Sequence, residues 1–361
     1  MIYRLVFENL RHRPVRTLLS VVAIGVGVTM ILTLAGVSRG MLNGMAERSR
    51  GTGADIMIQP PDSSVIGFTG TMSEKFVDLV RKQDHVALAT GTLMQPVHFL
   101  DYVTGIHLDE FSAITGGLHY LEGGPFRDPS DLLVDEIYAR AHNLHAGDMV
   151  DMGHKWRVCG VIEQGKLSRA FADLGSLQDL FSSTGKISVV WLKLDDPANI
   201  PTVKAALEQK LEGYKIVPMD EVVSLFSVDN VPYLKPFTRV VIALAAFFGF
   251  LMVSLSMYTA VLERTREIGI LKALGASPGY IVGLLLRETV VLAVAGTVVG
   301  IAMTYGTREI MAVFVPNMPQ AIVPDWYPVA AAIAVGGSLI GAVYPGLKAA
   351  NQDAIEALAY D

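Results

Sequence analysis

The chain has 361 residues with 29 Lys+Arg and 35 Asp+Glu, and 51% of its residues are hydrophobic while 18% are charged. This charged fraction is below the roughly 25% of soluble domains, and the mean hydropathy is +0.42, so part of the surface must lie in a membrane. The formal net charge of -6 excludes a nucleic-acid-binding protein, which needs a basic footprint. The single cysteine, Cys159, excludes an internal disulfide.

Four uncharged or nearly uncharged apolar runs predict four transmembrane helices, because a helix needs about 20 apolar residues to cross the hydrocarbon core. We expect them at residues 17–38, 238–262, 280–303 and 327–347. A cleaved secretory signal is the alternative for the first run. Its length of about 22 residues exceeds the roughly 7 to 15 of a signal-peptide core, which favours a membrane helix.

Basic residues near the helix ends predict the orientation, because cytoplasmic loops are enriched in Lys and Arg. The N-terminal segment 1–16 and the connection 263–279 carry most of them: Arg4, Arg11, Arg13, Arg16, Arg264, Arg266 and Lys272. We therefore expect both segments and the tail 348–361 in the cytoplasm. The loop 304–326 and the long insertion 39–237 are expected outside.

The insertion 39–237 differs from the apolar runs in charge and in its pattern of short predicted elements. It holds 18 Lys+Arg against 26 Asp+Glu, so nearly all of the acidity of the chain lies here. Short β-rich runs at 55–59, 156–162 and 187–193 are separated by Gly, Pro and Asp turns, and helical patterns occur at 73–82 and 198–211. The predicted fold is a membrane protein with four transmembrane α-helices and a large α+β extracytoplasmic domain inserted between helices 1 and 2.

Three short motifs resemble reactive sites only in part. Residues 160–167 match a phosphate-binding loop except at Leu167, where magnesium binding needs Ser or Thr, and we interpret them as a strand and a turn. Residues 36–40 have the letters of a hydrolase nucleophile elbow but end a membrane helix. His142 and His145 lack an evident third metal ligand. We expect a non-catalytic chain without a metal or cofactor of its own.

Small residues four apart allow close helix contact in lipid. They occur at Gly36, Gly40, Gly296, Gly300, Gly337 and Gly341. Packing within one chain and a dimer contact are both open interpretations. Arg287 and Glu288 lie inside the third apolar run, where ionisable groups are costly. We expect Arg287 to reach the headgroups and Glu288 to pair with a cation from a neighbouring helix.

The segment 263–278 is the most informative. Gly275 can end a short helix in the left-handed conformation, and Ser277 and Pro278 can begin the next one. At 100° per residue, apolar and acidic residues share one face of this helix, which fits a groove on another protein better than a membrane surface. These residues are Glu263, Glu267, Ile270, Leu271 and Leu274.

This segment resembles the signature of the FtsX-like permease domain shared by MacB-type exporters, LolC and LolE, and FtsX. The matching residues include Arg264, Arg266, Glu267, Ile268, Leu271, Leu274 and Gly275. The insertion is similar to the MacB-type periplasmic core at Asp135, Glu136, Gly147 and Asp148, among others. By matched position, the resemblance implies that the seven signature residues couple the permease to an ATPase.

The resemblance further implies a permease subunit of an ABC transporter in the bacterial cytoplasmic (inner) membrane. A separate ATPase would bind ATP and Mg, and mechanotransmission would move the external domain to export or extract a drug, peptide, lipid or lipoprotein. The resemblance also implies a second permease subunit, which forms a homo- or heterodimer with this chain. Membrane lipids surround the dimer, and a periplasmic adaptor or lipoprotein chaperone is a further implied partner. One alternative is an FtsX-like regulator that activates a cell-wall hydrolase. Another is a membrane-anchored binding module without an ATPase.

Overall fold

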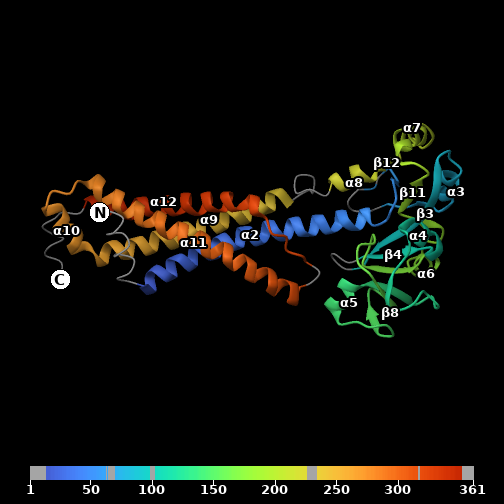
Figure 1. Cartoon of the computed structure of the whole chain (residues 1–361), viewed down its shortest axis with the longest axis horizontal. Helices are drawn as coiled ribbons and strands as arrows, with labels where there is room; N and C mark the ends of the chain where they lie inside the picture. The colour runs from blue at the N-terminus through green and yellow to red at the C-terminus, as the bar shows by residue number, and fades with distance from the viewer. Residues whose placement is uncertain are drawn as a thin grey trace. The chain divides into compact units, whose positions relative to one another are not determined.

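The computed structural model describes residues 14–61, 63, 70–97, 102–225, 234–315 and 318–351. The chain forms two compact units (Figure 1), a membrane unit of residues 1–39, 233–312 and 320–361, and an inserted domain of residues 40–232 and 313–319. The predicted N-terminal segment and C-terminal tail lie almost wholly outside the described residues.

Four helices of the described chain are long and apolar enough to cross a membrane. They are α2 (Pro14–Arg50), α9 (Leu234–Glu263), α11 (Pro278–Phe314) and α12 (Tyr327–Asn351). The short helix α10 (Thr265–Ala273) lies between α9 and α11, and the single-turn helix η2 (Pro324–Trp326) precedes α12. Since the inserted domain follows the first of the four, the predicted fold class is confirmed.

Two helices continue well past the predicted apolar runs. Both α2 and α11 have 37 residues, or about 55 Å at the rise of an α-helix, whereas the hydrocarbon core is about 30 Å thick. Residues 39–50, expected in the inserted domain, and residues 304–314, expected in a loop, are therefore helical. Hydropathy marks the apolar part of a helix, while the helix itself ends only where breakers occur, such as Gly51 and Gly53 after α2.

A ten-stranded mixed sheet forms the inserted domain, in the order β12-β1-β11-β3-β4-β9-β6-β8-β5, with β7 also paired to β8. The β4/β9 and β6/β8 pairs are parallel and the other pairs are antiparallel. The strands are β1 (Ile56–Gln59), β3 (Val86–Pro96), β4 (Tyr102–Ile106), β5 (Tyr120–Gly123), β6 (Asp131–Asp135), β7 (Met149–Asp151), β8 (Lys155–Ile162), β9 (Ala170–Asp173), β11 (Val189–Leu194) and β12 (Lys215–Pro218).

The predicted strand at 187–193 is divided in two. Strand β10 (Lys186–Ile187) pairs with β2 (Met72–Ser73) in a separate small sheet, whereas β11 pairs with β3. The break falls at Ser188, whose N–H donates to the carbonyl O of Thr92 and whose Oγ accepts from the N–H of Met94. Hydrophobicity alone could not locate this break, because residues on both sides of it are buried.

Helices cover the sheet and close the core of the inserted domain. They are α3 (Lys75–Arg81), α4 (Leu108–Thr115), α5 (Glu136–His142), α6 (Leu174–Leu180), η1 (Pro197–Asn199), α7 (Ile200–Lys210) and α8 (Met219–Leu225). The predicted helices at 73–82 and 198–211 correspond to α3 and to η1 with α7. Trp156, Trp191, Phe111 and Phe171 are among the largest fully buried side chains.

Candidate functional site

Helix α10 ends at the residues that the sequence indicates, whereas it begins at Thr265, so that Glu263, expected on this helix, is the last residue of α9. The N–H of Gly275 donates to the carbonyl O of Lys272, and the N–H of Ala276 donates to that of Leu271, the two bonds of a Schellman motif. Gly275 has φ +93°, which an L-residue rarely adopts. Ser277 Oγ accepts from the N–H of Tyr280 at 3.3 Å, and α11 starts at Pro278. The C-terminal end of the short helix is thus fixed by local chemistry.

The surface of α10 has a buried side and an exposed side. Ile268 is 7% exposed and belongs to a cluster of apolar side chains in the membrane unit, while Leu271 is half-buried. Leu274 is 80% and Ile270 46% exposed, and both Arg266 and Glu267 are exposed. We call the four exposed residues, Arg266, Glu267, Ile270 and Leu274, the α10 face.

Arg264 connects the start of α10 to α11. Its Nη1 lies 3.3 Å from Oε2 of Glu288, and the two side chains are 11% and 2% exposed. This is the cation that the sequence predicts for Glu288. At the other end of α10, Lys272 Nζ donates to the carbonyl O of Ala350 in α12 at 2.8 Å. Both ends of the helix are therefore held by the membrane unit, and Arg264 is an internal anchor of α10.

The neighbouring Arg287 has a different environment from Glu288. It is exposed on α11, so consecutive residues of one helix point in opposite directions, the cation outward and the carboxylate inward. An outward arginine can reach lipid headgroups through its long apolar stem. Only the carboxylate of this pair is part of the α10 anchor.

The predicted close-contact glycines lie against backbone and side chains of the same chain. A Cβ on Gly300 would lie 2.6 Å from the carbonyl O of Gly25, and one on Gly296 would lie 2.7 Å from Ile24, both in α2. Gly341 approaches the carbonyl O of Phe250 in the same way. Gly36 approaches Ala321, Gly337 has ordinary contact distance to Ala246, and Gly40 is buried. The contacts of Gly36, Gly296, Gly300 and Gly341 support packing within one chain.

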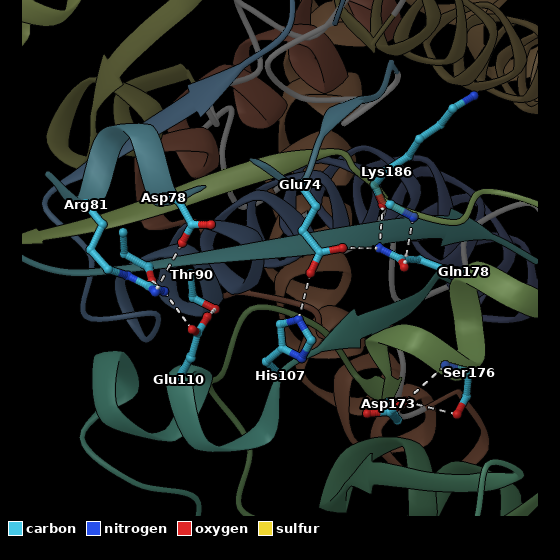
Figure 2. Close-up of polar contacts among 12 residues, drawn as sticks. Glu74, Asp78, Arg81, Thr90, His107, Glu110, Asp173, Ser176, Gln178 and Lys186 are labelled. Atoms are coloured by element: carbon cyan, nitrogen blue, oxygen red, sulfur yellow. Dashed lines mark hydrogen bonds and ion pairs between the residues drawn. The ribbon is translucent and has the colours of Figure 1, made fainter. Parts of the chain in front are cut away.

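Polar networks of the inserted domain join its elements. Figure 2 shows the Glu74 carboxylate between His107 Nε2 at 2.8 Å and Gln178 Nε2 at 3.0 Å, and Gln178 also donates to the carbonyl O of Lys186. Burial raises the pKa of Glu74, but the hydrogen bonds from Gln178 and His107 prevail and lower it. The network connects the start of α3, the start of α4, α6 and β10.

A second group in Figure 2 joins α3 to α4 and β3. Arg81 pairs with Glu110 at 2.6 Å, and Thr90 donates to the same carboxylate at 3.2 Å. In both groups each carboxylate is bonded to fixed donors of the domain itself. We interpret both groups as structural crosslinks.

The partial motifs of the inserted domain also have structural surroundings. Strand β8 ends at Ile162 and a turn follows, which confirms the interpretation of residues 160–167, and Lys166 Nζ donates to the carbonyl O of Thr115 at 2.7 Å. The ring of His142 packs against that of Tyr138 in a tilted arrangement, whereas His145 approaches Glu122. In the described part of the chain, no group of three or more His, Cys, Asp or Glu could hold a metal ion. The elbow-like residues 36–40 lie within α2.

Two family models match the chain. The model of the MacB-like periplasmic core domain matches residues 17–210, and that of the FtsX-like permease C-terminal domain matches residues 239–354. Together they include the inserted domain up to residue 210, without β12 and α8, and helices α9 (from residue 239) to α12 with the α10 face.

Relatives of this chain are named as permeases. The uncharacterized ABC transporter permease MJ1507 of Methanocaldococcus jannaschii is 22% identical over 98% of this chain and 96% of its own length. The macrolide export ATP-binding/permease protein MacB of Nitrobacter winogradskyi is 24% identical over 99% of this chain. The match covers 60% of the length of that MacB. The uncharacterized ABC transporter permease YknZ of Bacillus subtilis is 41% identical over 108 residues, and the match covers 26% of its length.

Two solved structures are also similar. The periplasmic region of MacB from Actinobacillus actinomycetemcomitans is 16% identical, with 50% of this chain and 96% of that chain covered and a TM-score of 0.39. The extracellular domain of YknZ from Gram-positive bacteria is 16% identical, with 45% and 98% covered and a TM-score of 0.35.

Proposed function

Because this chain belongs to the family of ABC transporter permeases with a MacB-like periplasmic core domain and an FtsX-like permease domain, we propose that it is the mechanical subunit of such a transporter. A separate ATPase binds ATP and Mg and seats on the α10 face. Its movement passes through the membrane helices to the inserted domain, outside the cytoplasmic membrane. The chain itself carries out no catalysis.

The observation that carries this proposal is the α10 face. Leu274 and Ile270 present apolar side chains to water beside the charged Arg266 and Glu267, on a helix whose two ends are fixed to α11 and α12. Covering a leucine side chain contributes about 1.5–3 kcal/mol to an association. Because Arg264 and Lys272 hold the helix, a push on this face would move the membrane unit rather than bend α10.

The ionic residues of the α10 face favour a protein groove over a lipid surface. A helix that lies on a membrane separates its apolar and charged residues onto opposite sides. Here Glu267 lies about one turn from Ile270 and about two turns from Leu274, all on the exposed side. A groove with apolar walls and a basic rim on the ATPase would satisfy all of these residues.

We further propose a cargo that is amphiphilic: a drug, peptide, lipid or lipoprotein, taken up on the outer side of the membrane. The permease would act as a homo- or heterodimer with membrane lipids around it, and an adaptor or lipoprotein chaperone would receive the cargo. Both termini and α10 would lie in the cytoplasm. The name of the MacB relatives, macrolide export, supports an export role.

The test uses Ile270→Glu and Leu274→Glu in the full chain, co-purified with its ATPase in mild detergent. We expect ATPase recovery to fall at least about tenfold, because replacing either apolar side chain weakens the association by about 1.4 kcal/mol or more. Val313→Glu, also at an exposed apolar residue but at the far end of α11, is the matched control and should retain the ATPase.

Undiminished ATPase binding and ATP-dependent activity in both α10 variants would refute the docking role. With the wild-type complex in proteoliposomes, ATP-driven cargo movement supports transport. Activation of a cell-wall hydrolase without cargo movement would instead support the regulatory alternative. If no ATPase co-purifies with the wild-type chain, the binding-module alternative is supported.

A further inference from the structure

The connection between α2 and β1 is surrounded by three separate parts of the inserted domain. After Arg50 the chain passes through Gly51, Thr52 and Gly53 before β1, and Thr52 is fully buried. Contacts come from the end of α4, from the turn after β8 and from β11. We call the contact residues Ile114, Thr115, Gly165 and Lys193, together with Lys166, which binds Thr115, the α2 socket.

Gly51 is the closest point of this contact. A Cβ added to it would overlap the carbonyl O of Gly165, and the carbonyl C of Gly165 would lie at 2.8 Å. Gly51 has no positive φ, so the requirement for glycine here is steric. The end of α2 and the turn after β8 can approach this closely because residue 51 has no side chain, while Gly165 supplies a positive φ of +100° in the turn.

Gly53 makes the second contact. Its φ of +67° is rarely adopted by L-residues, and a Cβ there would lie 2.5 Å from the carbonyl O of Ile114. Its own carbonyl O accepts from Lys193 Nζ of β11 at 2.8 Å. Lys166 binds the carbonyl O of Thr115 at 2.7 Å and thereby ties the turn after β8 to the end of α4. The three parts of the socket are therefore joined to the connection or to one another.

Arg48 in the last turn of α2 has a buried carboxylate of the inserted domain within reach of its charge. The charges of Arg48 and Arg169 act on the carboxylate of Asp135, which is 2% exposed at the end of β6 and accepts from the N–H of Tyr138. The main chain repeats this connection, since the N–H of Asp135 donates to the carbonyl O of Arg169. The turn between β8 and β9 thus meets the end of α2 at Gly165 and is joined to β6 through Arg169.

These contacts join the two halves of the sheet to the end of α2. Strands β1 and β11 lie in one half of the ten-stranded order, while β8, β6 and β9 lie in the other half. The covalent connection from α2 reaches only β1. A single covalent connection containing two glycines can act as a hinge, whereas a second contact to the other half of the sheet removes that freedom.

We propose that the α2 socket makes the end of α2 (residues 40–50) and both halves of the sheet one rigid body, so that movement of this helix end turns the whole inserted domain. Gly51, Gly53 and Lys166 are its positioning residues. The proposal assigns the Gly165-Lys166 pair of the incomplete phosphate-binding motif to holding a helix end. Its use in transport rests on the proposed function, but the rigidity of the joint can be measured without ATP.

The test is a pulsed electron–electron double resonance distance measurement on the full chain in nanodiscs. Cys159 is replaced by Ser, and spin labels are attached at Asn43→Cys on α2 and Lys75→Cys on α3, both exposed. We expect one narrow distance distribution. Gly51→Ala should widen it about twofold, because a hinged segment samples several orientations. Gly44→Ala, whose Cβ would have only an ordinary contact at 3.6 Å, should leave it narrow.

A distribution that stays narrow in Gly51→Ala overturns the proposal. If Gly51→Ala does not fold, Lys166→Met decides in the same way, because it removes the tie to Thr115 without adding volume. Lys155→Met, at an exposed lysine at the start of β8, is its control. If the distance distribution widens in Lys166→Met but not in Lys155→Met, the socket proposal is supported. If it widens in neither variant, the proposal is overturned.

A second arm separates this inference from the proposed function. The labelled chain is measured in complex with its ATPase, with and without ATP and vanadate. If the inserted domain of the wild type does not respond, the proposed function fails while the ATP-free measurement still decides the socket. If the wild type and Gly44→Ala respond and Gly51→Ala does not, the socket transmits the movement. An equal response in Gly51→Ala would show that transmission does not need it.

Discussion

Glu288 shows what one residue contributes to α10. Its carboxylate is 2% exposed in α11, where an unpaired charge costs several kcal/mol, and Arg264 lies 3.3 Å away at the start of α10. The sequence places a carboxylate in an apolar run and so predicts a cationic partner. Several cations stand near the helix ends, and only the packing of α9, α10 and α11 selects Arg264.

Arg264→Met leaves Glu288 buried without this partner. We expect a loss of about 3 kcal/mol in the free energy of unfolding, in the range for broken buried ion pairs, and restoration of part of it in the double variant Arg264→Met/Glu288→Gln. Thermal unfolding in detergent measures both. Arg266→Met, on the exposed side of α10, is the control, and equal stabilities of Arg264→Met and this control would contradict the anchor.

Asp131 gives the inserted domain a pH dependence. Burial raises the pKa of this carboxyl, but hydrogen bonds from the N–H groups of Arg127 and Asp128 and from the Arg157 guanidinium outweigh burial and lower it below the ordinary value of about 3.8. Because the pKa is lower in the folded state, the stabilisation is complete above the unfolded pKa. It is lost as the pH falls through the folded pKa.

We therefore expect Asp131→Asn to be less stable than the wild type at neutral pH and to approach it below a pH of about 4. Fluorescence of the buried Trp156 and Trp191 follows acid unfolding of the inserted domain in the full chain. Asp84→Asn, at an exposed carboxylate, should behave as the wild type does. A stability difference for Asp131→Asn that is constant over the whole pH range would exclude this linkage.

At the scale of elements, close packing of α2 with α11 organises the membrane unit. Gly296 and Gly300 lie against Ile24, Gly25 and Val28, and Thr29 Oγ1 donates to the carbonyl O of Gly300 at 3.0 Å. In lipid such contact comes from van der Waals packing and hydrogen bonds, because burying apolar side chains gains little. The glycine spacing predicts close approach, and the structure identifies α2 as the partner.

Gly300→Ala should separate α2 from α11. The added methyl would lie 2.6 Å from a backbone carbonyl, and overpacking of this kind costs about 1–3 kcal/mol. Gly306→Ala in the same helix is the matched control, because no atom lies within 4 Å of its added Cβ. The midpoint of thermal unfolding in detergent should fall only for Gly300→Ala, and an equal midpoint would contradict this contact.

At the scale of the whole molecule, the proposal requires the α10 face and the inserted domain to lie on opposite sides of the membrane. In the proposed topology, one crossing by α2 before the domain and one by α9 after it would produce this arrangement. A subunit that transmits movement across the membrane needs these two parts on opposite sides, whereas a peripheral binding domain does not.

The arrangement predicts opposite labelling of two cysteines in intact cells. In the Cys159→Ser chain, Lys75→Cys should react with a membrane-impermeant maleimide, whereas Ser277→Cys should react only after permeabilisation. Both positions are exposed, so access to the reagent depends on the side of the membrane alone. Equal labelling of both sites before permeabilisation would refute the transmission proposal.

Features that depend on neighbouring residues could be predicted from the amino-acid order alone. Apolar runs predicted the four helices because hydrocarbon thickness sets the length of the apolar part of each, and Gly275 with Ser277 and Pro278 marked the end of α10 through local backbone chemistry. The folded chain was needed to show that Ile268 is buried while Ile270 is exposed, and that Gly51 meets Gly165. Such contacts join residues far apart in the chain, and their geometry depends on how all the elements pack together.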